Sequence, residues 1–215
     1  MTTETQLREE IVAVAQAIDL AGFCPSKSGN VSARFGDGLL ITPSGLPYAR
    51  TTPADLIHLS LDGTVLSGSR KPSSEWPFHV AIYQARPDAQ AIVHTHSPRA
   101  TALSSTRRGI PAFHYMIALC GGADVRCADY ATFGTPELAE NAVKALDGRK
   151  AVLLANHGAI ALGGSLAGAH QIVAEVENLA GQYLDILAAG LEPVILDEAE
   201  MARVSAKFAG YGKVG

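Results

Sequence analysis

The sequence contains few cysteines, and their arrangement excludes two kinds of site. Cys24, Cys120 and Cys127 are odd in number, and no two of them have the C-x-x-C spacing. They therefore indicate neither a disulfide framework nor a cysteine-rich zinc site. We expect all three to be buried or neutral thiols.

Basic residues are also scarce. The chain has 17 Lys and Arg against 21 Asp and Glu, a formal net charge of −4. The basic residues are scattered and form no stripe of the kind that a nucleic-acid backbone requires. We therefore expect no nucleic-acid partner.

Long apolar runs are missing as well. The first 25 residues carry acidic side chains among the apolar ones, which a secretory leader would exclude. No later stretch reaches the roughly 20 uncharged residues of a membrane span. The sequence thus predicts no contact with a membrane, and we expect a cytoplasmic protein.

Nothing in the sequence divides the chain. It has no linker, repeat or low-complexity tract, and its apolar fraction of 47% suits a globular protein with a sizeable core. We predict a single domain over residues 1–215.

The periodicity of apolar residues predicts strands mixed with helices. Two hairpins are expected, around Gly36-Asp37-Gly38 and around Asp62-Gly63. Residues 150–162 contain two apolar runs broken at 156–158. Helices are predicted over residues 3–21, 74–86, 98–107, 136–146 and 166–189, and a strand over 91–95. This mixture predicts an α/β fold with helices layered around a mostly antiparallel central sheet.

Three histidines are candidate metal ligands. In an extended strand, His94 and His96 would point to the same face, although such a pair is also found as ordinary polar surface. His157 lies where a strand must turn sharply, beside Gly158, whose small size lets other groups approach the imidazole. Three imidazoles at strand ends fit an open catalytic zinc site, and other divalent metals are compatible with these ligands.

The remaining histidines carry weaker signals. His58 and His170 are expected on the solvent side of a strand and a helix, and His114 has no assignment. His79 lies one helical turn after Glu75, so it could hold that carboxylate in place.

Small polar turns suggest an anion site. Ser73 or Ser74 is expected to cap the helix that follows, and a helix N-terminus with nearby hydroxyls also suits phosphate. The turns at 28–30 and 42–45 are rich in donors and contain glycine. Together with a metal triad, these turns suggest a phosphorylated substrate.

Seven motifs in order give the chain a family resemblance: GNVSAR, ITPSG, PSSEWPFH, VHTHS, HYMIA, YATFGT and NHGAI. With them the sequence resembles the class II aldolase/adducin family over nearly its whole length. The resemblance implies the fold of that family, and it implies a cyclic homotetramer with active sites between neighbouring subunits.

The resemblance also implies roles for individual residues. It implies one Zn²⁺ per subunit held by His94, His96 and His157, with Glu75 as a ligand of the resting metal and as the catalytic base. Tyr115 and Tyr211 are implied in proton transfer to the aldehyde oxygen, and Phe133 in shaping the aldehyde side. The implied phosphate cradle consists of Gly29, Asn30, Ser44, Gly45, Ser73 and Ser74.

The implied activity is reversible cleavage of a ketose 1-phosphate, either L-fuculose 1-phosphate or a related deoxyketose 1-phosphate. The products would be dihydroxyacetone phosphate and an aldehyde. Two alternatives stay open. Thr95 between the first two histidines is typical of the pentulose-5-phosphate 4-epimerase branch, whereas a Glu at position 75 favours the aldolase branch. Adducin-type binding modules lose the metal ligands, all of which are present here.

Overall fold

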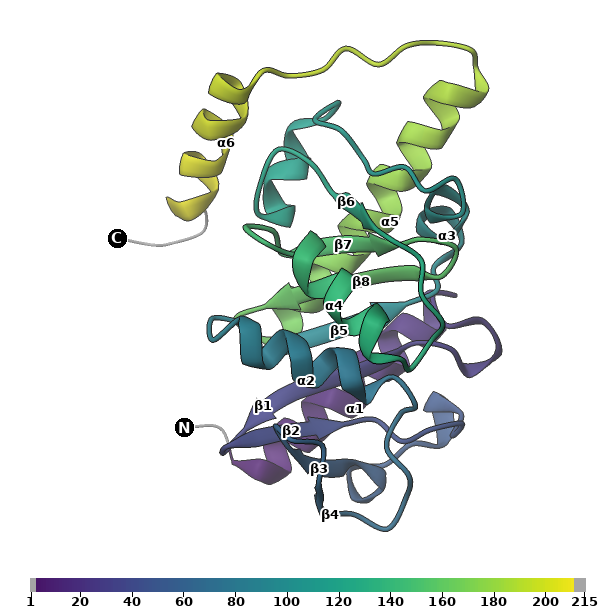
Figure 1. The fold of residues 1–215 in the computed structure, drawn as a ribbon, viewed down its shortest axis with the longest axis vertical. Helices are drawn as coiled ribbons and strands as arrows, with labels where there is room; N and C mark the ends of the chain where they lie inside the picture. Colours follow the sequence, from purple (N-terminus) through teal and green to yellow (C-terminus); the bar gives the residue numbers. More distant parts are fainter. Residues whose placement is uncertain (1–2, 211–215) are drawn as a thin grey trace.

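The structure is a computed structural model, and it describes residues 3–210. One mixed sheet of eight strands runs through this part of the chain in the order β4-β3-β2-β1-β5-β8-β7-β6 (Figure 1). Neighbouring strands are antiparallel except for the parallel pair β6 and β7. The predicted α/β fold around a mostly antiparallel sheet is confirmed.

The strands are short and most lie in the middle of the molecule. Their bounds are β1 (Asn30–Phe35), β2 (Gly38–Ile41), β3 (Ile57–Ser60), β4 (Val65–Ser67), β5 (Ala91–Thr95), β6 (Arg126–Ala128), β7 (Ala151–Leu154) and β8 (Gly158–Gly163). Both predicted hairpins are present, as β1–β2 and β3–β4.

The α-helices are α1 (Glu4–Leu20), α2 (Trp76–Ala85), α3 (Pro98–Ser104), α4 (Pro136–Ala145), α5 (Leu166–Ala188) and α6 (Glu198–Gly210). Residues 3–210 also contain four short 3-10 helices: η1 (Pro25–Lys27), η2 (Tyr48–Arg50), η3 (Pro53–Asp55) and η4 (Tyr115–Cys120). Among residues 3–210, no helix is both long and apolar enough to cross a membrane. Helix α6 is not among the helices predicted from the sequence, and it follows a long extended connection (Figure 1).

Two helix boundaries differ from those predicted. We expected a helix from residue 74, capped by Ser73 or Ser74, but α2 begins at Trp76 and its N-cap is Glu75. The preceding serines form a turn, in which Trp76 N donates to Ser73 O at 3.1 Å. The helix predicted to reach residue 107 ends at Ser104, and tighter turns follow, in which Thr106 N donates to Leu103 O and Arg107 has a left-handed backbone with φ 58°.

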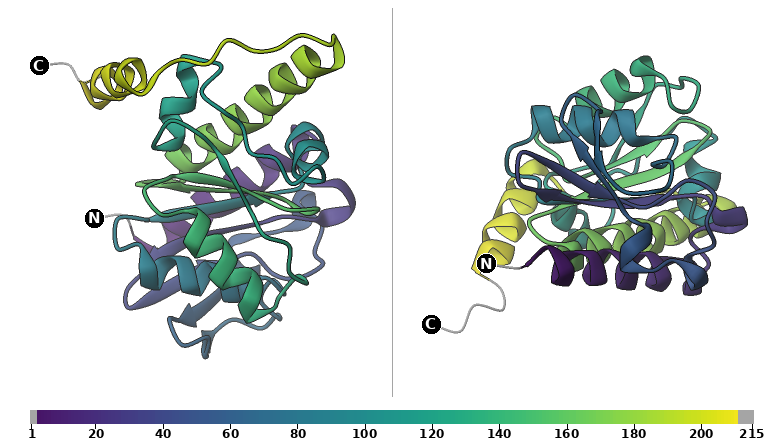
Figure 2. Two further views of the ribbon diagram at one scale, coloured as in Figure 1. Left: turned by 45° about the horizontal axis from the view of Figure 1, so that its top comes forward. Right: turned by 90° about the horizontal axis from the view of Figure 1, so that it is seen from below.

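Helices cover both faces of the sheet, with α2 and α4 on one face and α1, α3 and α5 on the other (Figure 2). The side chains of β5 alternate between the two cores: Val93 packs with the α1 and α5 side, and Ile92 with the α2 and α4 side. Every residue of β5 is buried. A strand at the centre of a covered sheet is therefore the support for His94.

The cysteines lie as expected. Cys24 and Cys120 are buried and Cys127 is half-buried, and all three are free thiols. Burial raises the pKa of Cys24 and of Cys120 to about 12, and that of Cys127 to about 11. All three are therefore neutral thiols at physiological pH.

Candidate active site

The three candidate histidines converge at the ends of adjacent strands. His94 lies in β5, His96 follows that strand directly, and His157 lies in the turn that joins β7 to β8. Their ring centroids are 4.7–4.9 Å apart, and the ring planes are steeply inclined to one another. The pairing of β5 with β8 thus brings together side chains that are 61–63 positions apart in the sequence.

The turn that carries His157 depends on two unusual backbone positions. Asn156 has a left-handed backbone with φ 54°, a conformation that asparagine tolerates better than most residues. A Cβ atom on Gly158 would lie 2.2 Å from the carbonyl oxygen of Thr95 and 3.3 Å from His96. The expectation that Gly158 permits a close approach to this site is confirmed.

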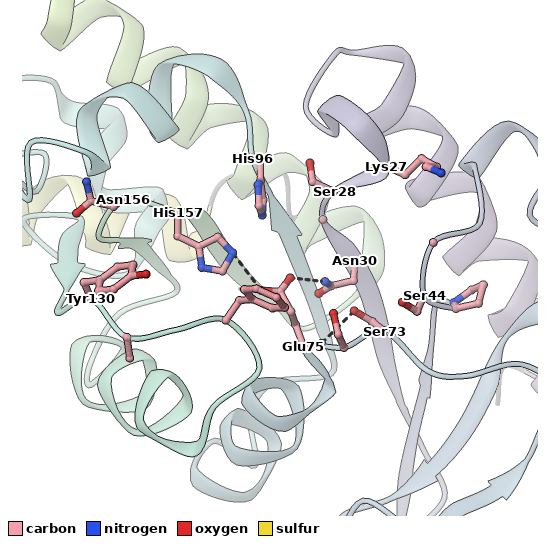
Figure 3. Close-up of a pocket in the computed structure, with 16 residues that line it drawn as sticks. Lys27, Ser28, Asn30, Ser44, Ser73, Glu75, His96, Tyr130, Asn156 and His157 are labelled. Atoms are coloured by element: carbon pink, nitrogen blue, oxygen red, sulfur yellow. Dashed lines mark hydrogen bonds and ion pairs between the residues drawn. The ribbon is translucent and has the colours of Figure 1, made fainter.

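Glu75 completes the cluster. It is 7% exposed, and its Oε2 lies 3.2 Å from Nε2 of His94, while its Oε1 lies 3.0 Å from Nε2 of His157. One ligand atom from each of Glu75, His94, His96 and His157 lies within 4.8 Å of the others. Figure 3 shows Glu75 between His157 on one side and Asn30 on the other.

The tautomers in the cluster suit a cation. Nδ1–H of His94 donates to the carbonyl oxygen of Ala159 at 2.9 Å, which leaves the Nε2 lone pair free for a metal. Nε2 of His96 faces that atom at 3.0 Å. Neighbouring ligands of a tetrahedral ion with bonds of 2.0–2.1 Å lie about 3.3 Å apart, close to these separations.

Charge and hydrogen bonding support the same assignment. Burial raises the pKa of Glu75, but the imidazoles of His94 and His157 lower it more, so the carboxyl is ionised. Burial, with His94 beside it, lowers the pKa of His96 to about 3, so His96 is neutral. Oε1 of Glu75 faces Nε2 of His157 at 3.0 Å, and no other partner for it is found among residues 3–210, as expected of an oxygen that shares a metal site with that imidazole. The donor set fits a divalent cation, including zinc.

Asn30 also holds the carboxylate of Glu75 in place. Its Nδ2 donates to Oε2 of Glu75 at 2.9 Å, and its Oδ1 is bonded to Nε2 of His79. His79 therefore reaches Glu75 through Asn30 and not by direct contact. The β1–β5 register places Asn30 opposite His94, which explains why both side chains meet Glu75.

A cavity of about 280 Å³ opens beside the cluster (Figure 3). One end is formed by the histidines and Glu75, and the other by small polar turns. The lining residues are Lys27, Ser28, Gly29, Asn30, Pro43, Ser44, Gly45, Ser73, Ser74, Glu75, His96, Tyr130, Ala131, Phe133, Asn156 and His157.

A comparison with family models identifies the chain. The model described as the class II aldolase and adducin N-terminal domain matches residues 9–184. The chain belongs to the class II aldolase and adducin family.

Two named members of the family are similar along almost the entire chain. The 5-methylthioribulose-1-phosphate/5-deoxyribulose-1-phosphate aldolase of Rhodospirillum rubrum is 50% identical over 206 residues, which cover 96% of this chain and 92% of that protein. The L-fuculose phosphate aldolase of Escherichia coli strain K12 is 45% identical over 207 residues, 96% of each chain. The chain is therefore a class II aldolase, an enzyme of the lyase class.

Solved structures of class II aldolases share the fold. An L-fuculose 1-phosphate aldolase superposes with a TM-score of 0.93 at 40% identity, covering 97% of this chain and 98% of that one. The L-fuculose-1-phosphate aldolase of Thermus thermophilus superposes with a TM-score of 0.76 at 30% identity, covering 88% of this chain and 98% of that one.

The residues that the aldolase resemblance implies fall into two groups. All of the expected phosphate residues, and Phe133, line the cavity beside Glu75. Tyr115 does not. It is half exposed and lines a second cavity, of about 570 Å³, between η4 and α6. Tyr211 lies outside the described residues.

Other predictions about histidines meet mixed outcomes. His58 is half-buried and alternates with the buried Ile57 and Leu59, and its ring edge meets Phe35 at 5.2 Å, so its side chain is only partly open to solvent. His170 is half-exposed on α5. His114, which had no assignment, accepts a hydrogen bond from Met116 N at 3.2 Å and begins η4.

Sequence reasoning missed several residues of the aldolase cavity. Lys27 follows Ser26 in η1, and both have left-handed backbones, with φ 67° and 57°. Tyr130 and Asn156 also line the cavity. Tyr130 and Asn156 stand inside two of the family motifs, YATFGT and NHGAI, which was an available signal. Lys27 had none, since its position depends on a turn without periodicity.

Proposed function

We propose that this class II aldolase cleaves a ketose 1-phosphate reversibly to dihydroxyacetone phosphate and an aldehyde, with one zinc ion per subunit. The observation that carries the proposal is the position of Glu75. Its ionised carboxylate stands between a three-imidazole cluster and a donor-rich end of the same cavity. The names of the two relatives support a deoxyketose 1-phosphate, such as 5-deoxyribulose or L-fuculose 1-phosphate.

The residues that would hold the ion are His94, His96 and His157, with Glu75 as the fourth. A divalent ion there would draw electron density from the substrate ketone and so stabilise the negative charge that develops when the neighbouring bond breaks. In the condensation direction Glu75 would take up a proton from the dihydroxyacetone phosphate carbon next to the ketone, and in cleavage it would return that proton to the same carbon. Glu75 is ionised and is held by the Asn30 amide, so it is in the state and position required of a base.

The opposite end of the cavity would bind the substrate phosphate. Ser44, Ser73 and Ser74 offer hydroxyl donors, and the Asn30 amide has a second hydrogen beyond the one donated to Glu75. Among the described residues that line the cavity, Lys27 is the basic one, and it would balance the phosphate charge. Phosphate binding here would hold the reacting carbon beside Glu75.

The aldehyde part of the sugar would extend toward Tyr130 and Phe133. Both rings are more than half exposed, so this end of the cavity is open to solvent in one subunit. We propose a cyclic homotetramer in which a neighbouring subunit completes the site. Tyr115, which lies outside the cavity of its own subunit, would then act with Tyr211 in proton transfer at a neighbour's aldehyde oxygen. Cytoplasmic location stays a prediction.

The structure favours the aldolase over the 4-epimerase. Thr95 is fully buried, and strand alternation turns its side chain to the face of β5 opposite His94. The residue between the two histidines therefore does not line the cavity, and it carries little weight in the choice of substrate. Glu75, the residue that favours the aldolase branch, does line the cavity.

One assay tests the proposal. The zinc-loaded protein is incubated with ketose 1-phosphates, ketose 5-phosphates and the unphosphorylated sugars, while dihydroxyacetone phosphate and epimers are both measured. We expect dihydroxyacetone phosphate from deoxyketose 1-phosphates alone. Epimer formation from a 5-phosphate without fragment release would establish the epimerase instead.

A further inference from the structure

A chain of buried polar side chains leads from Glu75 away from the cavity into the protein. Its members are Asn30 and Ser32 of β1 and His79 and Tyr83 of α2, each no more than 2% exposed. Asn30 and Ser32 are two positions apart on a strand, and His79 and Tyr83 are four apart on a helix, so each pair shares one face. The two faces meet beneath the cavity.

The direction of every hydrogen bond in this chain is fixed by chemistry. The Glu75 carboxylate only accepts, so Asn30 presents its amide N–H to it, at 2.9 Å. The oxygen of Asn30 then faces His79, whose Nε2 must donate. Nδ1 of His79 is left to accept from the Ser32 hydroxyl at 2.7 Å.

The Tyr83 hydroxyl begins the chain. It lies 3.0 Å from the Ser32 hydroxyl, which has already spent its hydrogen on His79, so Tyr83 donates. Burial lowers the pKa of His79 to about 3, which agrees with a ring that carries one hydrogen. Every hydrogen bond in the chain is therefore donated in the same direction, from Tyr83 toward the Glu75 carboxylate.

Packing holds both α2 members of the chain, His79 and Tyr83, in place. The Phe78 ring stacks on His79 at 4.7 Å and meets His94 edge-on at 5.3 Å. The Arg34 guanidinium lies over the Tyr83 ring at 4.8 Å and donates to the Tyr83 carbonyl at 2.8 Å. Apolar side chains would fill this space without desolvating polar groups, so packing alone does not account for the chain.

We propose that His79 is a positioning residue for Glu75, an inference that rests on the proposed function. Through Asn30 it fixes Oε2 of the carboxylate, while Oε1 is left facing Nε2 of His157 at 3.0 Å. Each donor in the chain polarises the next, which holds the carboxylate in one orientation.

The test uses the zinc-loaded full chain and two substitutions at one position. His79→Phe keeps a ring against Phe78 but removes both nitrogens, whereas His79→Gln returns an amide N–H where Nε2 was. For His79→Phe we expect kcat and the α-proton exchange of dihydroxyacetone phosphate to fall by about 10- to 100-fold, with KM and zinc content little changed. His79→Gln should recover most of that loss.

Two further variants separate positioning from stability. Ile82→Ala, a buried change on the same helix but outside the chain, should lower the unfolding temperature and leave kcat unchanged. Tyr83→Phe removes only the first donor and should lower kcat by roughly two- to fivefold. It serves as the test if His79→Phe does not fold.

A second measurement does not depend on activity. Nitrogen-15 NMR of the histidine side chains should show His79 protonated at Nε2 and His94 at Nδ1. An Nδ1–H tautomer for His79 would overturn the proposal, and so would a folded, zinc-loaded His79→Phe protein with wild-type kcat. Wild-type protein that neither exchanges the proton nor cleaves any ketose phosphate would instead overturn the proposed function itself.

Discussion

Asn30 and His94 lie directly opposite each other on β1 and β5, and both bond or face the same oxygen of Glu75. A residue that supports the carboxylate and a residue that would bind the cation are thus set by one strand register. A shift of one residue in that register would turn Asn30 away from the site. The metal cluster and its supporting hydrogen bonds therefore form together with the sheet.

The first prediction concerns the metal. Each of His94→Ala, His96→Ala and His157→Ala should lose most of the bound divalent ion and nearly all activity, because three ligands are the fewest that hold a catalytic zinc. Elemental analysis of purified protein measures the ion, and about one per chain is expected for the wild type. His170→Ala, on α5, is the control and should keep it. Full occupancy in His157→Ala would contradict the triad.

The second prediction concerns the base. Glu75→Gln keeps size and helix position, so the protein should fold and retain metal, but kcat should fall by ~10²–10⁴-fold with a smaller change in KM. Exchange of the dihydroxyacetone phosphate α-proton with deuterated water, followed by NMR, measures the step without an aldehyde. Glu137→Gln, an exposed acid in the first turn of α4, is the matched control. Undiminished exchange in Glu75→Gln would place the base elsewhere, with Tyr115 or Tyr211 the next candidates.

The third prediction concerns phosphate binding. Ser73→Ala, Ser74→Ala and Asn30→Ala should each raise KM for a phosphorylated ketose. The rise should correspond to a loss of ~1.5–3 kcal/mol in binding free energy, the value of a hydrogen bond to a charged group. Asn30→Ala should also lower kcat, since it removes the support of Glu75. Lys27→Met should raise KM and weaken its dependence on salt. Lys144→Met on α4 and Ser69→Ala in an exposed bend serve as controls. Equal cleavage of the unphosphorylated sugar would show that the phosphate end is misassigned.

The fourth prediction concerns Gly158. Gly158→Ala places a methyl group against the Thr95 carbonyl oxygen, so the β5–β8 pairing must open. We expect a loss of about 1–3 kcal/mol in the free energy of unfolding and weaker metal binding. Chemical denaturation and a metal titration measure the two effects. Gly164→Ala, where a new Cβ meets nothing within 4 Å, should show neither.

The fifth prediction concerns pH. The pKa of His79 is lowered to about 3 in the folded protein, against ~6.5 for an unfolded histidine. Between these values only the unfolded chain takes up the proton, so acidification below ~6.5 costs stability, by up to ~1.4 kcal/mol per pH unit. The loss is complete near pH 3.

Denaturant unfolding of metal-free protein between pH 4 and 7 checks this slope. His79→Gln should have a shallower pH dependence than the wild type. Ile82→Ala should lower stability by the same amount at every pH. Identical slopes for wild type and His79→Gln would mean that folding does not lower the pKa of His79.

Much of the fold was predictable because periodicity reports which face of an element is buried. The hairpins β1–β2 and β3–β4 and helices α1, α4 and α5 followed from apolar spacing and turn residues. The convergence of His94 and His96 followed from the strand period, and that of His157 from a glycine-bearing turn. Assignment of α6 failed because it lies on the periphery and buries little beyond Met201.

Other features depend on tertiary contacts that no local pattern encodes. The meeting of Asn30 with Glu75 follows from strand register, and the path from His79 to Asn30 from the packing of α2 on β1. The start of α2 at Trp76 reflects the position of Glu75 in the cluster, which outweighs the capping preference of Ser73 and Ser74. Lys27 lines the cavity because of a turn in which Ser26 and Lys27 both have left-handed backbones, and the amino-acid composition does not predict such a turn.

The burial of β5 on both faces has a consequence for the lifetime of the site. An amide in a central, fully covered strand exchanges with solvent only when the whole sheet opens. The backbone amide hydrogen of His94 should therefore be among the last to exchange. Fraying at the ends of the molecule does not expose it. Lys27 and Ser44, on short surface turns, should exchange far sooner. The end of the cavity that would hold the sugar phosphate can thus move on a timescale on which the backbone that carries His94 stays still.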